Sequence, residues 1–577
     1  MAVSSTAPAR SARPFERTSA ASAALVWARP ERWALPAILC LAFGARWWGL
    51  DYSLPAVYYT DEGKVMEDVR AMVATGNLRP EYFTYPSFWL YCLALLVAVG
   101  GPLSLALGAP FGAVPLDNPT FLYGTGRAAA ASMGALTLIP LYLLTARVGR
   151  AFGVAQPARV ALLACGFLAL APLHVQHGKI ASPDAPTTAF LTVALYACVR
   201  ILDDGRTRWY VLAALATGAA AGTKYPSALG AITIVVAHVG RHWLAGGGAS
   251  RVVRGIALDY RIWLAGALTA GFFVATSPYI LLDYERFRAA LAYESGKAFG
   301  RGVNGQIGAV GRAEGALFVP AVLARGLDVP VALLALVGLG YAAWMLAQNR
   351  GARWHAALLV AYPLTVYVFT WSWLMAFSRY VLPLVPFGCA LAALGVAAMF
   401  GLVKNGLVGN GRVAAVVAGV VALGSLAWQA DGVARYGAML TREDTRTVAA
   451  DWMNANLPPG ETVWMEWYTP SYRNARQLGW ELSDRTVERQ RARGARYVMT
   501  SSFTYDRWLS APDRYPARVA FYETLKRDAA RLYHVDPLPA FSYDPTQELW
   551  DGWHGIPFGP EARPGPRLSV YRLDSGP

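Results

Sequence analysis

The sequence has little charge and few cysteines. Asp, Glu, Lys and Arg make up 15% of its 577 residues, against about 25% in soluble domains. The five cysteines, Cys40, Cys92, Cys165, Cys198 and Cys389, all lie in apolar stretches. This placement excludes a disulfide framework or a cysteine-based metal site in the polar last third of the chain.

Motifs of soluble nucleotide and metalloprotease chemistry are also missing. The chain has no Walker phosphate loop, no dinucleotide-binding glycine pattern and no HExxH sequence. A net charge of +15 could suggest nucleic acid. The arginines, however, stand in the gaps between apolar blocks and form no continuous stripe, so membrane topology explains them better. We therefore expect no nucleic-acid partner.

Long apolar blocks are what the sequence has in abundance, many of them near the roughly 20 residues needed to cross a bilayer. We predict a polytopic, all-α membrane protein with about eleven spans. These are 33–50, 121–145, 160–176, 186–202, 210–223, 226–244, 262–281, 327–347, 355–374, 380–402 and 413–430. With a cytoplasmic tail at 1–32, every inner loop carries two or three basic residues, as the positive-inside rule requires. Those loops are 146–159, 203–209, 245–261, 348–354 and 403–412.

The apolar segment 87–108 does not fit this pattern as a span, because counting it would invert every later loop. We predict that it lies along the outer membrane surface, where its aromatic start suits the headgroup region. Residues 61–76, with an acidic first turn, are predicted to form a second surface helix. Both helices belong to a large first outer loop, 51–120, within a membrane domain that covers 33–430. A second outer loop is predicted at 282–326.

From residue 431 the chain is polar and aromatic, and 431–577 is predicted to form a small α/β domain. Because the predicted number of spans is odd and the N-terminus is cytoplasmic, this domain is predicted to lie outside the cytoplasm. The predicted helices are 441–457 and 518–533, and the predicted strands are 462–468, 496–501 and 568–573. Trp464, Trp467 and Tyr468 could stack on a sugar or a peptide, with core packing as the alternative.

Polar side chains gather at the outer ends of the predicted spans and in the first outer loop. Charges near a membrane are costly and tend to mark function. These come from distant parts of the chain but share one face, which is the best sequence evidence for a site. They are Asp61, Glu62, His174, His177, Lys179, Asp184, Lys224 and Arg379.

Each group has two interpretations. Asp61 and Glu62 could supply a general base and its hydrogen-bond or metal partner, or simply an acidic helix start. The two histidines with Asp184 could hold a metal or form a hydrogen-bonded loop. Lys224 and Arg379 suit the phosphate of a lipid-linked substrate, or reach toward the membrane surface.

A set of short strings in this order resembles the membrane glycosyltransferases of family 39, which have the GT-C fold and include protein O-mannosyltransferases and aminoarabinose transferases. The strings span 46–390 and have the family's order. They are Asp61-Glu62, Tyr85-Pro86-Ser87, Gly126-Arg127, Asp184, Gly222-Thr223-Lys224-Tyr225, Ser277-Pro278-Tyr279 and Arg379-Tyr380-Val381-Leu382-Pro383.

The resemblance implies transfer of one sugar from a polyprenyl-phosphate donor to an acceptor hydroxyl, with inversion, on the outer side of a bacterial plasma membrane. It makes Asp61 the base and Glu62 its positioning or cation-binding neighbour. The residues expected to bind donor phosphate or substrate are Lys64, Tyr85, His177, Asp184, Lys224 and Arg379. No cofactor is firmly implied, and participation of a divalent cation is left open.

The chain departs from both subfamilies just before the predicted surface helix at 87–108. Aminoarabinose transferases have a carboxylate and a lysine where this chain has Thr84 and Tyr85, and mannosyltransferases have a His-Pro-Pro string. The acceptor class, whether lipid, glycan or protein, and any bound metal therefore stay open. The alternatives to an enzyme are a transporter or flippase of lipid-linked saccharides, and a non-catalytic envelope assembly protein. A transporter should have charges at the membrane midplane or paired repeats, and the sequence shows neither.

Overall fold

A computed structural model describes residues 31–573 with short gaps. The gaps are 107–115, 247, 299–311, 349–350, 372, 374–376, 408, 480–484, 510–511, 514, 538–542, 545–548 and 551–552. The predicted cytoplasmic tail, 1–32, lies outside the described residues except for its last two.

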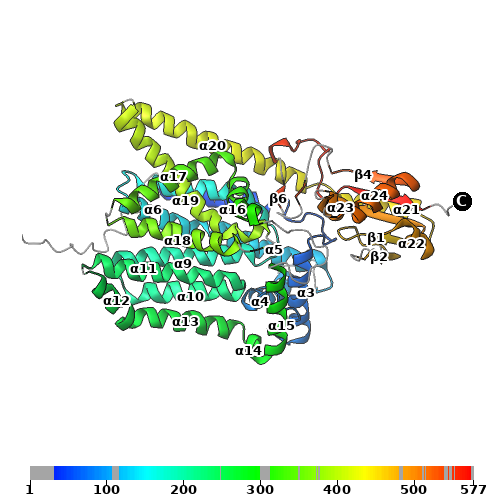
Figure 1. Ribbon diagram of the computed structural model, residues 1–577, viewed down its shortest axis with the longest axis horizontal. Helices are drawn as coiled ribbons and strands as arrows, with labels where there is room; N and C mark the ends of the chain where they lie inside the picture. The colour runs from blue at the N-terminus through cyan, green and yellow to red at the C-terminus, as the bar shows by residue number, and fades with distance from the viewer. Residues whose placement is uncertain are drawn as a thin grey trace, which may run out of the picture.

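A bundle of helices forms the larger part of the molecule, and a small domain caps one end of it (Figure 1). Most bundle helices run along the long axis of the molecule. They are α2 (Glu31–Trp47), α5 (Pro119–Leu136), α6 (Leu138–Ala151), α7 (Pro157–Leu170), α9 (Asp184–Asp204), α10 (Thr207–Thr223), α11 (Ala231–Leu244), α13 (Tyr260–Thr276), α16 (Arg312–Leu327), α17 (Val329–Ala347), α18 (Arg353–Trp371), α19 (Val385–Leu402) and α20 (Gly411–Leu440). Shorter elements connect them: α8 (Pro172–His177), η2 (Tyr225–Gly230), α12 (Ala249–Leu258), α14 (Tyr279–Leu282), η3 (Ser378–Tyr380) and η4 (Leu382–Leu384).

Six helical segments of the described residues are long and apolar enough to cross a membrane, and four shorter helices are also apolar. The long segments include the joined pair α5 and α6, Pro119–Ala151, and the α9 helix. This confirms a polytopic helical membrane protein, while the exact number of crossings stays a prediction.

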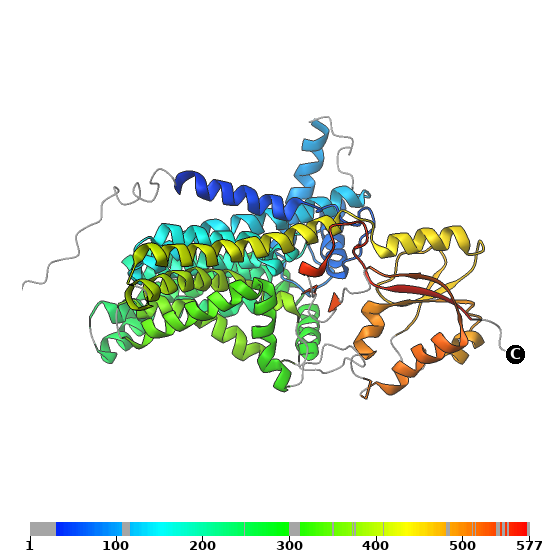
Figure 2. The same cartoon turned by 90° about the horizontal axis from the view of Figure 1, so that it is seen from above.

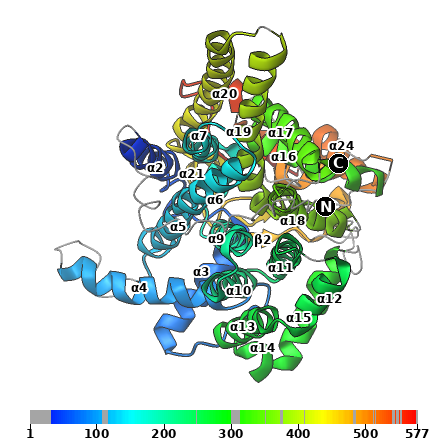
Figure 3. The ribbon, with the colours of Figure 1, turned by 90° about the vertical axis from the view of Figure 1, so that its left-hand side faces the viewer.

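The first outer loop forms two helices, α3 (Thr60–Thr75) and α4 (Phe88–Ala106). Figures 2 and 3 show α4 running across the bundle axis and away from the other helices. An apolar cluster that includes Val65, Val69 and Leu93 joins α3 to α4. Because this cluster also includes Leu122 of α5, it fixes the start of α3, and therefore Asp61, against the bundle.

Two segments differ from the sequence predictions. The predicted outer loop 282–326 contains the helices α15 (Tyr284–Ala298) and α16, and the apolar part of α16 packs into the bundle core through Phe318 and Val322. The predicted last span, 413–430, continues as one helix to Leu440. No Pro or Gly pair interrupts it after residue 430, and Arg435 contacts Asp431 one turn earlier at 2.8 Å, a spacing that supports helix.

The C-terminal domain is the predicted α/β unit. Its five-stranded sheet has the order β2-β1-β3-β7-β4. The three strands β2, β1 and β3 are parallel, and β7 pairs antiparallel with both β3 and β4. The elements are α21 (Thr445–Asn456), β1 (Val463–Met465), β2 (Ala475–Gln477), α22 (Val487–Ala492), β3 (Tyr497–Ser501), α23 (Ser502–Leu509), α24 (Pro516–Asp528), β4 (Ala530–Val535) and β7 (Leu568–Arg572), with a separate β5 (Tyr543–Asp544) and β6 (Leu549–Trp550) pair.

The predicted C-terminal boundary of the helix 518–533 is wrong. The helix stops at Asp528, and residues from Ala530 form strand β4 on the edge of the sheet. Pairing with β7 supplies backbone partners that a local helix pattern cannot reveal. The short strand β2 was also not predicted, and its three exposed residues give no alternating apolar signal.

The C-terminal domain is tied to the segment that leads into Asp61. Arg446 at the start of α21 pairs with Asp444 at 2.7 Å and donates to the carbonyl oxygen of Tyr58 at 3.3 Å. The Tyr58 hydroxyl lies 3.0 Å from the Thr447 hydroxyl. The domain therefore covers the end of the bundle at which α3 begins.

Candidate functional site

Asp61 lies in the first turn of α3, where the helix dipole favours a carboxylate. Its Oδ2 atom is 3.1 Å from the Arg379 guanidinium, which comes from the short helix η3 about 320 residues later in the chain. The Asp61 side chain keeps 18% of its surface exposed. The two residues that the sequence placed on one face are therefore directly paired.

A second ion pair joins Asp184 and Lys224. Asp184 begins α9, Lys224 follows α10, and the lysine ammonium donates to Asp184 Oδ1. Ser182 donates to the other carboxylate oxygen at 3.0 Å. Only 1% of the Asp184 side chain is exposed, so its charge is neutralised almost entirely within the protein.

The aromatic ring of Tyr380 connects the two ion pairs. The Lys224 ammonium lies 4.8 Å from the ring centre, and the Arg379 guanidinium carbon lies 5.7 Å from it. Both distances are in the range of cation–π contacts. The two cations therefore lie around one ring, and their carboxylate partners belong to the same charge cluster.

His177 and Tyr85 lie within this cluster. Neither ring nitrogen of the fully buried His177 has a hydrogen-bond partner among the described residues. Burial lowers the pKa of His177 to about 4, and Asp184, Arg379, Lys224 and Asp61 all act on it electrostatically. The imidazole is therefore neutral at physiological pH. Burial, followed by the Asp61 carboxylate, raises the pKa of the Tyr85 hydroxyl well above its ordinary value.

Glu62 has a different environment from its neighbour Asp61. Its two carboxylate oxygens accept hydrogen bonds from Arg127 at 2.9 and 2.8 Å, and Oε1 also accepts from the Ala181 backbone N–H at 2.8 Å. Both side chains of the pair are fully buried. Arg127 further donates to the carbonyl oxygens of Leu50 and Tyr52 at 3.0 and 2.8 Å. Glu62 therefore anchors α3, and Arg127 is the cation that it holds.

Lys64 lies one turn along α3 from Asp61. Its side chain is half-buried. It has no ion pair or hydrogen bond with any residue that the structure describes. The ammonium is therefore the one predicted phosphate ligand whose charge is not already matched by a described carboxylate.

The metal interpretation of His174 and His177 is not supported by their contacts. Arg46 lies 2.8 Å from His174 Nδ1 and donates to the Ala169 carbonyl oxygen at 3.0 Å. A guanidinium at this distance competes with a metal ion. Lys179 donates to the carbonyl oxygens of Arg46 and Trp48. These bonds place His174 in a hydrogen-bonded loop at the break between α7 and α8, whereas the ring nitrogens of His177 take no part in it.

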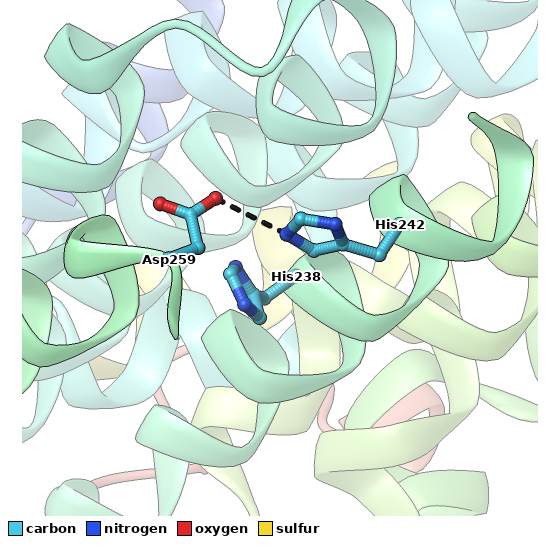
Figure 4. Close-up of side chains that lie close together, drawn as sticks. All are labelled: His238, His242 and Asp259. Carbon is cyan, nitrogen blue, oxygen red and sulfur yellow. Dashed lines mark hydrogen bonds and ion pairs between the residues drawn. The ribbon is translucent and has the colours of Figure 1, made fainter. Parts of the chain in front are cut away.

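One other cluster has ligands of the kind that bind metals. His238 and His242 are one turn apart on α11, and Asp259 caps α13 (Figure 4). His242 Nε2 is 3.1 Å from Asp259 Oδ2, and the Tyr210 hydroxyl is 2.8 Å from His238 Nδ1. The cluster lies by α12, at the end of the bundle away from the C-terminal domain (Figure 1). It is therefore remote from Asp61.

The sequence did not predict the roles of three residues of the site: Arg127, Tyr380 and Arg46. Arg127 and Tyr380 stand in the family strings, but no local pattern reveals that one neutralises Glu62 and the other lies between Lys224 and Arg379. Arg46 ends a predicted span, where an arginine is usually assigned to the membrane surface. In the structure its side chain is fully buried instead.

Comparison with solved structures finds distant likenesses in overall shape. ArnT from Cupriavidus metallidurans bound to undecaprenyl phosphate aligns over 97% of this chain and all of that chain, with 16% identity and a TM-score of 0.46. The oligosaccharyltransferase of Archaeoglobus fulgidus in its apo form aligns over 88% of this chain and 73% of that chain, with 12% identity and a TM-score of 0.48. Comparison of the sequence with curated proteins finds no significant match.

The helical bundle and its polar end define a multi-pass membrane protein. Residues 124–258, from α5 to the end of α12, match the family model described as dolichyl-phosphate-mannose-protein mannosyltransferase. The matched segment is 135 of the 577 residues, and this similarity agrees with the resemblance of the motifs to GT-C membrane glycosyltransferases. The matched segment contains Arg127, Asp184 and Lys224.

Proposed function

We propose that this protein is a membrane glycosyltransferase that transfers one sugar from a polyprenyl-phosphate donor to an acceptor hydroxyl on the extracytoplasmic side of a bacterial plasma membrane, with inversion. Asp61 is the general base. The cations Lys64, Lys224 and Arg379 bind the donor phosphate, with Tyr85 and His177 beside them. A lipid-phosphate donor agrees with the family model, whose description names a dolichyl-phosphate sugar.

The observation that carries this proposal is the difference between the three carboxylates. Glu62 is fully buried with both oxygens engaged by Arg127, and Asp184 is almost as buried beside Lys224. Asp61 is the most exposed of the three, with 18% of its side chain accessible, and it pairs with Arg379. A base must reach the proton that it abstracts, so Asp61 is the carboxylate suited to an acceptor hydroxyl.

The proposed step uses these groups as follows. The acceptor hydroxyl transfers its proton to Asp61 as its oxygen attacks the anomeric carbon. The bond from that carbon to the phosphate oxygen breaks, and the lipid phosphate leaves with the electron pair. Attack on the face opposite the phosphate inverts the anomeric configuration. The cations stabilise the charge that develops on the leaving phosphate.

The ion pair between Asp61 and Arg379 gives donor binding a second role. A guanidinium lowers the basicity of the carboxylate that it pairs with. The donor phosphodiester carries one negative charge and can accept two parallel hydrogen bonds from arginine, so it can take the place of the carboxylate. When donor phosphate engages Arg379, Asp61 is released toward the acceptor, so the base becomes active only when the donor is present.

The test is sugar transfer by purified protein in detergent or vesicles. A panel of radiolabelled polyprenyl-phosphate hexoses and pentoses is supplied with envelope extract as acceptor source. Asp61→Asn keeps the shape of the side chain and removes its basicity, so transfer should fall by about 10²–10⁴-fold. Asp117→Asn, at an exposed carboxylate in the same outer loop, is the matched control and should keep full activity.

Transfer by Asp61→Asn at the wild-type rate would remove Asp61 from the role of base. Absence of transfer by the wild type with every donor would contradict the polyprenyl-phosphate proposal itself. The sidedness is tested separately with Asp117→Cys in a chain whose five native cysteines are replaced by alanine, labelled with a membrane-impermeant reagent in intact cells. Labelling only after the cells are broken would place the loop in the cytoplasm.

A further inference from the structure

A loop of the C-terminal domain, 466–472, follows strand β1 and lines a cavity of about 380 Å³. The cavity volume lies in the range of small-molecule sites, about 300–1,000 Å³. Aromatic rings and polar groups line it together, including Trp467, Tyr468, Tyr472 and Arg476. We name residues 466–472 the aromatic loop.

The aromatic loop lies at the carboxyl ends of parallel strands, on the edge where open α/β sheets bind their ligands. From β1 the chain passes to β2 on one side and returns to β3 on the other. The crevice at such a reversal of strand order is the usual ligand position. The loop after β1 and the start of α23, which follows β3, meet there, because Thr504 donates to the Trp467 carbonyl oxygen at 2.9 Å.

This edge of the sheet faces the helical bundle. The end of β3 at Ser501 pairs with the start of β7 at Leu568. Just before β7, the Pro566 carbonyl accepts from Thr445 at 2.7 Å, next to Arg446 that reaches the carbonyl of Tyr58. Figure 1 likewise shows α23, which follows β3, on the bundle side of the domain. The aromatic loop is therefore on the same side of the domain as the segment that carries Asp61.

The loop is held from beneath by a buried carboxylate. Glu466 is buried and pairs with Arg485, and it accepts from the Tyr522 hydroxyl and from the Ser501 backbone N–H. Among the described residues that line the cavity, Glu466 is the one carboxylate, and Arg485 neutralises its charge. A fixed support of this kind keeps the loop in one shape without a ligand, which reduces the entropy cost of binding.

The backbone and exposure of the loop are unusual for core packing. Tyr468 has a positive φ of 63°, a conformation that costs a bulky residue energy and is concentrated at functional sites. The Trp467 side chain, directly before it, is 42% exposed. Exposed tryptophan beside hydrogen-bonding groups is the typical surface for stacking on a sugar ring, because its face is apolar and sugar hydroxyls need polar partners.

Taken with the proposed transfer, on which this inference rests, we propose that the aromatic loop binds the saccharide part of the acceptor. Trp467 stacks on one sugar ring, and Arg476 with the exposed backbone of the loop bonds to its hydroxyls. The loop faces the bundle, so a bound glycan would extend its free hydroxyl toward Asp61. The basic side chain of Arg476 and the neutralised Glu466 suit a neutral or acidic saccharide.

Two measurements test the loop. The first is saturation-transfer NMR of the detergent-solubilised full chain with trisaccharides of mannose, glucose, galactose and N-acetylglucosamine, and with a Ser/Thr-rich peptide as a competitor. A saccharide signal should disappear in Trp467→Ala and persist in Trp467→Phe. Leu532→Ala, at an exposed apolar residue on β4 at the opposite edge of the sheet, is the matched control and should keep the signal.

The second measurement separates KM from kcat in the transfer assay. Trp467→Ala should raise the KM for the saccharide acceptor about three- to tenfold, as expected for loss of one stacking contact, with the donor KM and kcat unchanged. An unchanged acceptor KM, or displacement of every saccharide by the peptide, would overturn the role of the loop. Saccharide binding through Trp467 without transfer by the wild type would instead contradict the proposed reaction and leave the binding loop intact.

Discussion

Replacing Glu62 by Gln removes one charge from a fully buried ion pair and changes almost nothing in shape. The amide oxygen can still accept from Arg127 Nε and the Ala181 backbone N–H, whose bonds to Glu62 measure 2.9 and 2.8 Å, but the amide NH2 group faces the second Arg127 donor and cannot accept from it. The Arg127 guanidinium, however, stays buried without a counter-charge. Removal of one member of a buried pair costs about 3–5 kcal/mol, mainly because the remaining charge is left uncompensated.

We therefore expect Glu62→Gln and Arg127→Met each to lower the free energy of unfolding by about 3–5 kcal/mol. The double variant should lose less than the sum, because it leaves neither charge alone. The assay is denaturant titration of the protein in detergent micelles, followed by fluorescence. Glu67→Gln on the same helix is the control. Its exposed pair with Arg70 is worth about 1 kcal/mol or less.

The same measurement distinguishes anchoring from catalysis. If Glu62 serves mainly to hold α3, Asp61→Asn should lower transfer by about 10²–10⁴-fold in the folded protein and lose less stability than Glu62→Gln, because the Asp61 pair with Arg379 is partly exposed. Glu62→Gln should lose stability first and activity only as the protein unfolds. Wild-type stability in Glu62→Gln, or additive losses in the double variant, would refute the buried pair and the anchoring role with it.

Three further changes have defined outcomes. Lys64→Met should raise the donor KM about tenfold and leave the thermal midpoint unchanged, since no described residue pairs with Lys64. The KM is measured from initial rates against donor concentration, and the midpoint from a thermal melt. The folded His177 takes up a proton near pH 4, against 6.5 as its ordinary value, so the unfolded chain binds more protons between these values and stability falls as pH drops through them. Between about pH 7.5 and pH 5, the free energy of unfolding of the wild type should fall by about 2 kcal/mol more than that of His177→Asn. Equal losses for the two proteins in denaturant titrations would contradict this. Arg446→Met should loosen the C-terminal domain from Tyr58, seen as faster limited proteolysis between the two parts, while Arg531→Met on the exposed sheet edge should not.

The sequence by itself was enough for the class of protein and for much of the candidate site. Apolar blocks and arginine placement require only local counting, because a bilayer acts on each segment separately. The same counting set 87–108 apart from the spans, and α4 runs across the bundle. The ordered strings also selected Asp61, Asp184, Lys224 and Arg379, whose two ion pairs are found in the structure.

The sequence could not assign partners to those charges. Glu62 and Asp61 are adjacent and chemically alike, and both were predicted to take part in catalysis. Only the packing of α3 against α5 shows that Glu62 is enclosed with Arg127, while Asp61 stays partly exposed beside Arg379. Burial is a property of the surrounding elements, so no pattern along the chain distinguishes the two carboxylates.

The same reason explains the errors at the end of the chain. Strand β4 exists because β7 offers it a row of backbone partners, although the paired β7 residues come 33 to 42 positions later in the chain. The sequence determined that 431–577 is an α/β domain, but it left open whether the tryptophans of this domain pack in the core or stack on a ligand. Only the tertiary structure decided that Trp467 is exposed on the edge facing the bundle, because strand order and domain orientation arise from contacts between segments far apart in the sequence.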